Sequence, residues 1–146
     1  MDKIAIALSG GADSLMSLLL LREAGADVMA VHALFLPEVD EALVEGLRAT
    51  CSALGLPFAV IDLRAEFEEL VVAPFVRAYQ DGLTPNPCAA CNPAIKFGLL
   101  LDRAGELGAE RLATGHYARL EARSWGPALF RGLDPAKDQS YFLSMV

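Results

Sequence analysis

The chain has 146 residues, 54% of them apolar, and 12 basic and 19 acidic side chains give a net charge of -7. This length suits a single domain over residues 1–146 with a sizeable core, and the acidic balance argues against a dominant basic surface for nucleic acid. The charge is uneven, because residues 1–92 carry 5 basic and 13 acidic side chains, whereas residues 93–146 carry 7 and 6. We therefore expect any RNA contact in the second part, or in sequence beyond this chain.

The N-terminal residues show no secretory signal, since Met1-Asp2-Lys3 leads directly into a short apolar run. That run, residues 4–8, is far too short to cross a membrane. Three cysteines in such a chain fit chemistry or packing better than a disulfide framework. We expect a cytoplasmic protein with no membrane partner, and the sequence leaves its oligomeric state open.

Strand and helix patterns alternate along the first half of the chain. Short apolar runs that predict buried strands lie at residues 3–8, 28–32 and 58–63. Helical spacing and good helix formers predict helices at residues 14–24, 40–54 and 66–79. Continuous apolar strands between helices are typical of a parallel sheet covered on both faces, so we predict a doubly wound, mostly parallel α/β fold.

The alternation breaks at residues 82–93, where several prolines predict a stiff, irregular loop. After this loop the pattern predicts a helix over residues 95–107 and a fourth strand over 111–114. Residues 117–131 predict a hairpin around Trp125-Gly126-Pro127, and residues 132–146 a turn followed by an apolar tail.

Two glycines and two serines follow the first strand, in the string Ser9-Gly10-Gly11-Ala12-Asp13-Ser14. The glycines let the backbone approach an anion, and the following helix N-terminus directs free N–H groups and a positive dipole at it. Asp13 suits a Mg²⁺ ion or a hydrogen-bond network. The alternative is a plain turn capped by serine. The string lacks the Gly-Lys-Ser/Thr ending of a Walker loop, and it resembles the PP-loop of the ATP pyrophosphatases instead.

Further segments extend this likeness along almost the whole chain, which resembles the tRNA-specific 2-thiouridylase family. The matching segments are Thr84-Pro85-Asn86-Pro87, Cys91-Asn92, Ile95-Lys96-Phe97-Gly98, Ala113-Thr114-Gly115-His116-Tyr117-Ala118, Arg131-Gly132-Leu133-Asp134 and Lys137-Asp138-Gln139-Ser140-Tyr141-Phe142-Leu143. The resemblance implies a Rossmann-like adenine nucleotide alpha hydrolase fold. It also implies that ATP adenylates the C2 oxygen of a wobble uridine in tRNA, after which sulfur from a cysteine persulfide displaces AMP. A persulfide sulfur-donor protein would then be a partner.

The resemblance also implies roles for individual residues. Cys91 corresponds to the nucleophilic cysteine. The residues implied for the ATP site are Ala7, Leu8, Ser9, Gly10, Gly11, Ala12, Asp13, Ser14, Ala33 and Gly115. Those implied for the target base and the tRNA are Asn86, Pro87, Lys137, Asp138 and Gln139. His116 is open between a role in this site and a structural role at a strand end.

The residues around Cys91 indicate an activated thiol. A helix expected to start near Pro93 would place Cys91 at its N-terminus, where the pKa of a thiol falls. The alternative, a buried and inert cysteine, fits Cys51 on the inner face of its helix. It fits Cys88 and Cys91 poorly, because proline-rich loops run over surfaces.

The chain departs from the family pattern at Cys88, where the family usually has an aspartate that assists proton transfer. The change creates Cys88-x-x-Cys91, so both cysteines are catalytic candidates. The pair could be a redox couple, a metal site or a persulfide relay. With Cys51 it could hold an iron–sulfur cluster, whereas structural zinc would also need His32 or His116.

The family's persulfide-bearing cysteine lies beyond the Lys137-Asp138-Gln139 segment, and so do its later domains. The chain is therefore either an N-terminal catalytic domain or a short homologue in which Cys88 and Cys91 replace that cysteine. Two alternatives to a tRNA thiolase stay open: a PP-loop sulfurtransferase or ligase on another substrate, and a nucleotide-binding domain that is inactive in isolation.

Overall fold

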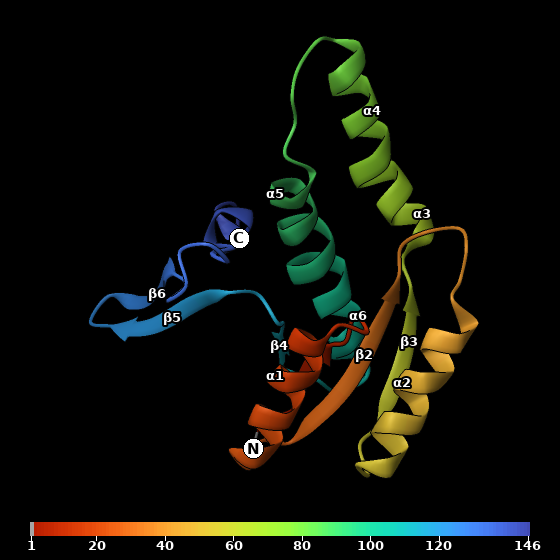
Figure 1. Ribbon diagram of the computed structural model, residues 1–146, viewed down its shortest axis with the longest axis vertical. Coiled ribbons are helices and arrows are strands. Elements are labelled where there is room, and N and C mark those ends of the chain that lie inside the picture. The colour runs from red at the N-terminus through yellow and green to blue at the C-terminus, as the bar shows by residue number, and fades with distance from the viewer. Residues whose placement is uncertain (1) are drawn as a thin grey trace.

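The computed structural model describes residues 2–146. Its centre is a four-stranded parallel sheet with strand order β3-β2-β1-β4 (Figure 1). Helices cover both faces of the sheet, which confirms the predicted doubly wound α/β fold. The strands are β1 (Ile4–Ala7), β2 (Val28–Leu34), β3 (Phe58–Asp62) and β4 (Arg111–Ala113).

Alternate side chains of each strand enter two separate cores, as the pleat of a strand requires. Ile6 and Ala30 belong to the core under α1 (Ala12–Glu23) and α2 (Glu41–Ala53). Ala5 and Val31 belong to the core on the opposite face. The apolar runs in the sequence are therefore continuous because both faces of the sheet are buried.

Two long helices cover the second face and extend past the carboxyl ends of the strands (Figure 1). Each one contains a π-helical stretch, in which backbone hydrogen bonds join residues five apart. The first is built from α3 (Arg64–Phe67), η1 (Glu68–Val72) and α4 (Ala73–Gln80). The second is built from α5 (Pro87–Cys91), η2 (Asn92–Leu100) and α6 (Leu101–Glu106).

The prediction of an irregular loop over residues 82–93 is wrong in its second half, because the helix begins at Pro87. Asn86 caps it, since its side-chain oxygen accepts a hydrogen bond of 3.3 Å from the Ala89 N–H. Proline is tolerated in a first helical turn, where its missing N–H has no partner to lose. The same prolines that indicated a loop therefore begin a helix.

The hairpin consists of β5 (Ala118–Arg123) and β6 (Gly126–Arg131), and it projects away from the main sheet (Figure 1). Arg123 pairs with Gly126, so the turn is Ser124-Trp125 and lies slightly earlier than predicted. The predicted apolar tail contains the short 3₁₀ helix η3 (Ser140–Leu143). Across the described residues, none of the helices combines the length and apolar character that crossing a membrane requires.

Candidate functional site

The loop between β1 and α1 is organised by its two serines. The Ser9 N–H donates to the Ser14 hydroxyl oxygen at 3.2 Å, and the Ser14 hydroxyl donates to the Gly11 carbonyl at 3.0 Å. The Ser9 hydroxyl accepts from the Gly11 N–H at 3.3 Å. Gly11 is the N-cap of α1 and makes no side-chain cap, so the first turn of α1 keeps N–H groups directed out of the helix.

Two glycines allow the loop its close contacts. Gly10 has φ of +87°, and a Cβ atom there would lie 2.5 Å from a methyl group of Leu43. Gly115, just after β4, packs on the first turn of α1, and a Cβ atom would lie 2.9 Å from the Ser14 nitrogen. Both residues were predicted for this site, and both are required to be small by backbone geometry or packing.

A cavity of about 360 Å³ opens beside this loop, at the carboxyl edge of the sheet. Ligands of doubly wound sheets bind at this edge. Its lining includes seven residues that the sequence predicted for the ATP site, whereas Gly10, Gly11 and Ala12 shape the loop behind it. The lining residues are Ala7, Leu8, Ser9, Asp13, Ser14, His32, Ala33, Phe35, Lys96, Leu100, Thr114, Gly115, His116 and Gln139.

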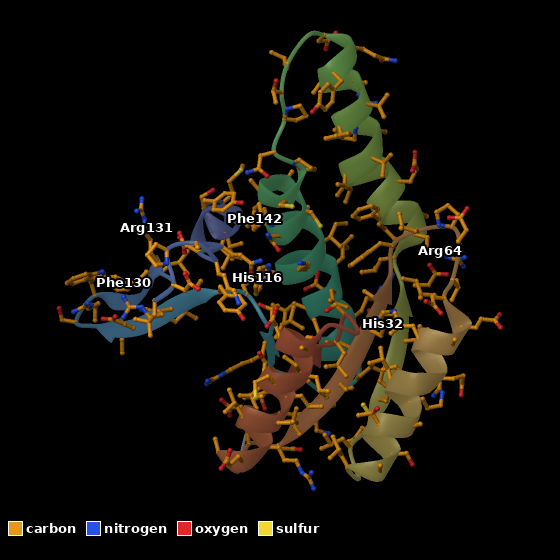
Figure 2. All side chains as sticks on the ribbon, viewed as in Figure 1. His32, Arg64, His116, Phe130, Arg131 and Phe142 are labelled. Atoms are coloured by element: carbon orange, nitrogen blue, oxygen red, sulfur yellow. The ribbon has the colours of Figure 1, made fainter. Side chains whose placement is uncertain are left out.

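His116 lies on the cavity wall between η2 and the hairpin (Figure 2). Its Nε2 is 3.5 Å from the Lys96 ammonium, and its Nδ1 is 2.7 Å from the Thr114 hydroxyl. Burial and the Lys96 charge both lower the pKa of His116. The imidazole is therefore neutral at pH 7, and because an ammonium can only donate, Nε2 accepts and Nδ1 carries the proton toward Thr114.

His32 and Lys96 line the cavity, although the sequence analysis assigned neither of them to it. The His32 Nδ1 is 2.7 Å from the Leu8 carbonyl oxygen, and a carbonyl only accepts, so Nδ1 is protonated. This bond fixes the end of β1 directly before the serine loop. The strand period could have indicated His32, which follows the buried Val31 at the carboxyl end of β2.

Cys88 and Cys91 occupy one side of the second long helix, one turn apart. Cys88 is exposed in the first turn, and Cys91 is half-buried against the core. The expectation that a helix N-terminus lowers the pKa of Cys91 is wrong, because the helix already begins at Pro87. Burial instead raises the pKa of Cys91, and the Lys96 charge opposes part of that rise.

Cys51 lies apart from this pair, as the prediction of a core-facing cysteine implied. It is fully buried in the core under α1 and α2, whereas Cys91 packs against the core on the other face of the sheet. The sheet thus separates Cys51 from the pair, so the structure does not support a three-cysteine cluster. Within residues 2–146, no three His, Cys, Asp or Glu side chains gather so as to hold a metal ion.

The residues expected to contact base and tRNA lie in two places. Asn86 and Pro87 begin the helix of the cysteine pair. Lys137, Asp138 and Gln139 lie next to the start of the hairpin. The Asp138 carboxylate accepts from the Gly132 N–H at 2.8 Å and from the N–H and hydroxyl of Ser140, and these bonds lower its pKa. Asp138 therefore holds its own loop together.

Gln139 connects this C-terminal loop to the cavity. Its side-chain oxygen accepts from the Tyr117 N–H at 3.0 Å, and its own N–H donates to the Tyr117 carbonyl at 2.9 Å. The Tyr117 hydroxyl in turn donates to Asp13 at 2.9 Å, and this bond raises the pKa of Tyr117. Asp13 therefore belongs to a hydrogen-bond network, one of the two roles that the sequence suggested for it.

Asn92 joins the cysteine helix to the C-terminal segment. Its buried amide nitrogen donates to the Cys88 carbonyl at 3.0 Å and to the Phe142 carbonyl at 2.9 Å. The site therefore assembles from three distant segments: the serine loop, the cysteine helix and residues 114–142.

Comparison with known proteins agrees with this geometry. A family model described as tRNA methyl transferase HUP domain matches residues 2–146. The chain belongs to this family. HUP-family relatives named tRNA-specific 2-thiouridylase MnmA include one from Nitratidesulfovibrio vulgaris, which is 58% identical over 99% of the chain. Another, from Thermus thermophilus, is 42% identical over 98% of the chain. The chain covers 43% and 42% of their lengths, less than half of either.

Solved structures support the fold of this HUP-domain chain. A predicted subunit of tRNA methyltransferase from Methanocaldococcus jannaschii is similar with a TM-score of 0.55 and 19% identity, over 79% of this chain and 53% of its own. A glutamine-dependent NAD⁺ synthetase from Acinetobacter baumannii, solved with ADP, has a TM-score of 0.51 and 21% identity, over 79% of this chain and 22% of its own. At these identities the likeness establishes the fold alone.

Proposed function

We propose that this chain carries the ATP-dependent adenylation site of a tRNA-uridine 2-sulfurtransferase. The observation that carries the proposal is the cavity at the carboxyl edge of the sheet, where the serine loop and first turn of α1 face Gly115 and His116. The high identity to relatives named as 2-thiouridylases supports tRNA as the substrate. The partners that this reaction needs are tRNA and a protein that donates persulfide sulfur.

The residues that line the cavity suit a nucleoside triphosphate. The volume of about 360 Å³ lies within the range of small-molecule sites. N–H groups in the first turn of α1 and the hydroxyl of Ser9 can donate to phosphate oxygens, whereas the Ser14 hydroxyl donates to the Gly11 carbonyl and holds the loop in shape. The small side chains of Ala7 and Ala33 leave apolar space for an adenine ring. We propose Gly115 as the residue that lets the two sides of the cavity approach each other.

The Asp13 carboxylate fits a Mg²⁺ ion, which in nucleotide sites needs one or two carboxylates besides phosphates and water. Asp13 lines the cavity, and the Tyr117 hydroxyl orients one of its oxygens. When bound, the ion would neutralise phosphate charge. Nothing in the positions of Cys88 and Cys91 requires an iron–sulfur cluster for this chemistry.

The reaction then follows from the weakness of a uridine carbonyl as an electrophile. The C2 oxygen attacks the α-phosphorus of ATP, pyrophosphate leaves, and the adenylated oxygen becomes a good leaving group. In the arrangement where the cysteine pair replaces the family's later cysteine, a persulfide on Cys91 attacks C2 through its terminal sulfur and AMP departs, which leaves the base joined to Cys91 through a sulfur–sulfur bond. The thiolate of Cys88, one turn away, then attacks the Cys91 sulfur, so that a Cys88–Cys91 disulfide forms and the base leaves with its thiocarbonyl. An external thiol reductant returns the pair to the dithiol. The wobble base must leave its stack to reach the cavity. Asn86 and Pro87 begin the helix that contains Cys91, and we propose that they contact the wobble base.

The test is release of AMP and pyrophosphate from ATP, with and without unmodified tRNA, for the wild-type chain and Cys91→Ser. We expect tRNA to stimulate AMP formation in both proteins, and sulfur transfer from a persulfide donor in the wild type alone. Buried Cys51 serves as the control, since Cys51→Ala should leave both activities intact. ATP binding without any stimulation by tRNA would contradict the proposal and favour a PP-loop enzyme with another substrate.

A further inference from the structure

In the second long helix, Cys91 and the cavity-lining residue Lys96 have an unusual spacing. In an α-helix, residues three or four apart share a face, whereas a π-helix brings residues five apart together. Lys96 follows Cys91 by five residues, and the π-helical stretch η2 runs from Asn92 to Leu100. This register lets the thiol and the ammonium share one side of the helix.

Two residues account for the π-helical stretch. Pro93 lacks an N–H and cannot close the regular α-helical hydrogen bond. Gly98 then approaches it closely, because a Cβ atom on Gly98 would lie 2.8 Å from the Pro93 carbonyl oxygen. The widened turn therefore depends on a residue without a side chain, five positions after the proline.

Lys96 lines the cavity, whereas Cys91 of the same helix is not among the lining residues. Lys96 is half-buried and lies 3.5 Å from the His116 Nε2. Among the described lining residues, Lys96 is the lone lysine or arginine, and Asp13 is the lone carboxylate. Without the Lys96 charge, the lining would be negative toward a polyanionic nucleotide, which Coulomb repulsion disfavours.

We propose that the Lys96 ammonium is a catalytic group shared by both steps, contacting nucleotide phosphate in the cavity and stabilising the sulfur anion at Cys91. The inference rests on the proposed function and adds a residue and a coupling to it. A fixed donor aimed at developing charge is the kind of group that accelerates such a step. The Lys96 charge also opposes the effect of burial on the Cys91 thiol.

His116 acts in this arrangement as a positioning residue. The Thr114 hydroxyl orients the imidazole through Nδ1, so that the lone pair on Nε2 faces Lys96. A neutral acceptor holds the ammonium in place without removing its charge. The segment that directly follows β4 thereby sets the position of Lys96 on the second long helix.

The thiol half of the proposal is tested by alkylation of Cys91 with iodoacetamide as a function of pH. The full chain is used in a Cys88→Ser background, so that Cys91 reports alone beside buried Cys51. We expect Lys96→Met to slow alkylation about tenfold below the pKa of the thiol, the effect of losing one nearby opposite charge. Lys96→Arg should restore most of the rate. If the alkylation rates of the Cys88→Ser protein with and without Lys96→Met follow the same dependence on pH, the proposal is overturned.

The phosphate half is tested by the affinities of ATP and adenosine for the same variants. Lys96→Met should weaken ATP binding at least about tenfold and leave adenosine unchanged, because adenosine carries no phosphate. An equal loss for both ligands would mean a structural role and overturn the proposal. His116→Leu should shift both readouts in the same direction, and His116→Asn, which retains an acceptor, should recover them.

Neither measurement uses tRNA or turnover, so the two proposals can fail separately. A Lys96-dependent thiol rate and ATP affinity, together with no AMP formation on any tRNA, would support the Lys96 assignment and overturn the tRNA substrate. AMP formation that is undiminished in Lys96→Met would overturn the Lys96 assignment and leave the thiolase function intact.

Discussion

Burial and a neighbouring ammonium act in the same direction on His116, since both lower the pKa of its imidazole. In the unfolded chain, the imidazole of His116 would have its ordinary pKa of about 6.5. Just below that pH the unfolded state binds more protons than the folded state, so the free energy of unfolding must rise with pH there. The loss of folding stability caused by His116 is absent above about pH 6.5, and it grows as the pH falls toward the lowered pKa of His116.

The first prediction concerns this dependence on pH. We expect wild-type stability to fall more steeply than that of His116→Asn as the pH decreases from about 7 to 5. Urea unfolding at a series of pH values measures both slopes, and His32→Asn serves as the matched control on the other histidine of the cavity. Parallel curves for wild type and His116→Asn would contradict a lowered pKa at His116.

At the scale of a single element, the helix of residues 87–106 carries Cys88, Cys91 and Lys96, three residues of the proposed site. Asn86 and Pro87 set its start, Pro93 and Gly98 its π-helical stretch, and Asn92 its attachment to η3. π-helical turns are costly in isolation and occur frequently at functional sites. Here the irregular stretch brings Lys96 of the cavity into register with Cys91.

The second prediction compares two glycines of this helix. Gly98→Ala forces a Cβ atom against the Pro93 carbonyl oxygen and should destabilise the chain by about 1–3 kcal/mol, the usual cost of overpacking. Gly105→Ala meets nothing within 4 Å and should stabilise the exposed helix by about 0.5–1 kcal/mol. Urea unfolding gives both values. Equal effects of the two substitutions would count against a tight π-helical turn.

At the scale of the whole molecule, charge is distributed by region. The acidic residues concentrate in residues 1–92, while the hairpin carries three arginines, two of them over one aromatic ring. The guanidinium groups of Arg119 and Arg123 lie 5.8 Å and 4.8 Å from the Phe130 ring centre. Arg131, the residue after Phe130, is exposed on the opposite face of the hairpin, and the hairpin stands apart from the sheet (Figures 1 and 2). This distribution suits a backbone contact to RNA in the second part of the chain.

The third prediction concerns salt. If the hairpin contacts tRNA phosphates, Arg131→Ala should weaken tRNA binding and reduce the dependence of log affinity on log salt by about one. Arg22→Ala, in the last turn of α1, should leave the slope unchanged. A filter-binding titration between low and moderate salt measures this slope. An unchanged slope in Arg131→Ala would place the RNA contact elsewhere.

The fold class and the serine loop could be predicted from the sequence alone, because they depend on short-range patterns, whereas the strand order β3-β2-β1-β4 came from the structure. Apolar runs, glycine stops and helical spacing act over a few residues, so β1, α1 and Gly10 could be located without coordinates. Cys51 could likewise be assigned to a core from its helix face. Both cores of the sheet then follow from burial on two faces.

The environment of the candidate site residues depends on tertiary packing. From its residues alone, the proline-rich segment could be a loop or the capped start of a helix. It is helical from Pro87 in the structure, where the cysteine helix packs on the sheet. That helix start reversed the expected direction of the Cys91 pKa, because burial outweighs a terminus that lies a turn away. The Lys96–His116 contact joins residues twenty positions apart. Local patterns do not encode such contacts, since they arise when separate elements pack together.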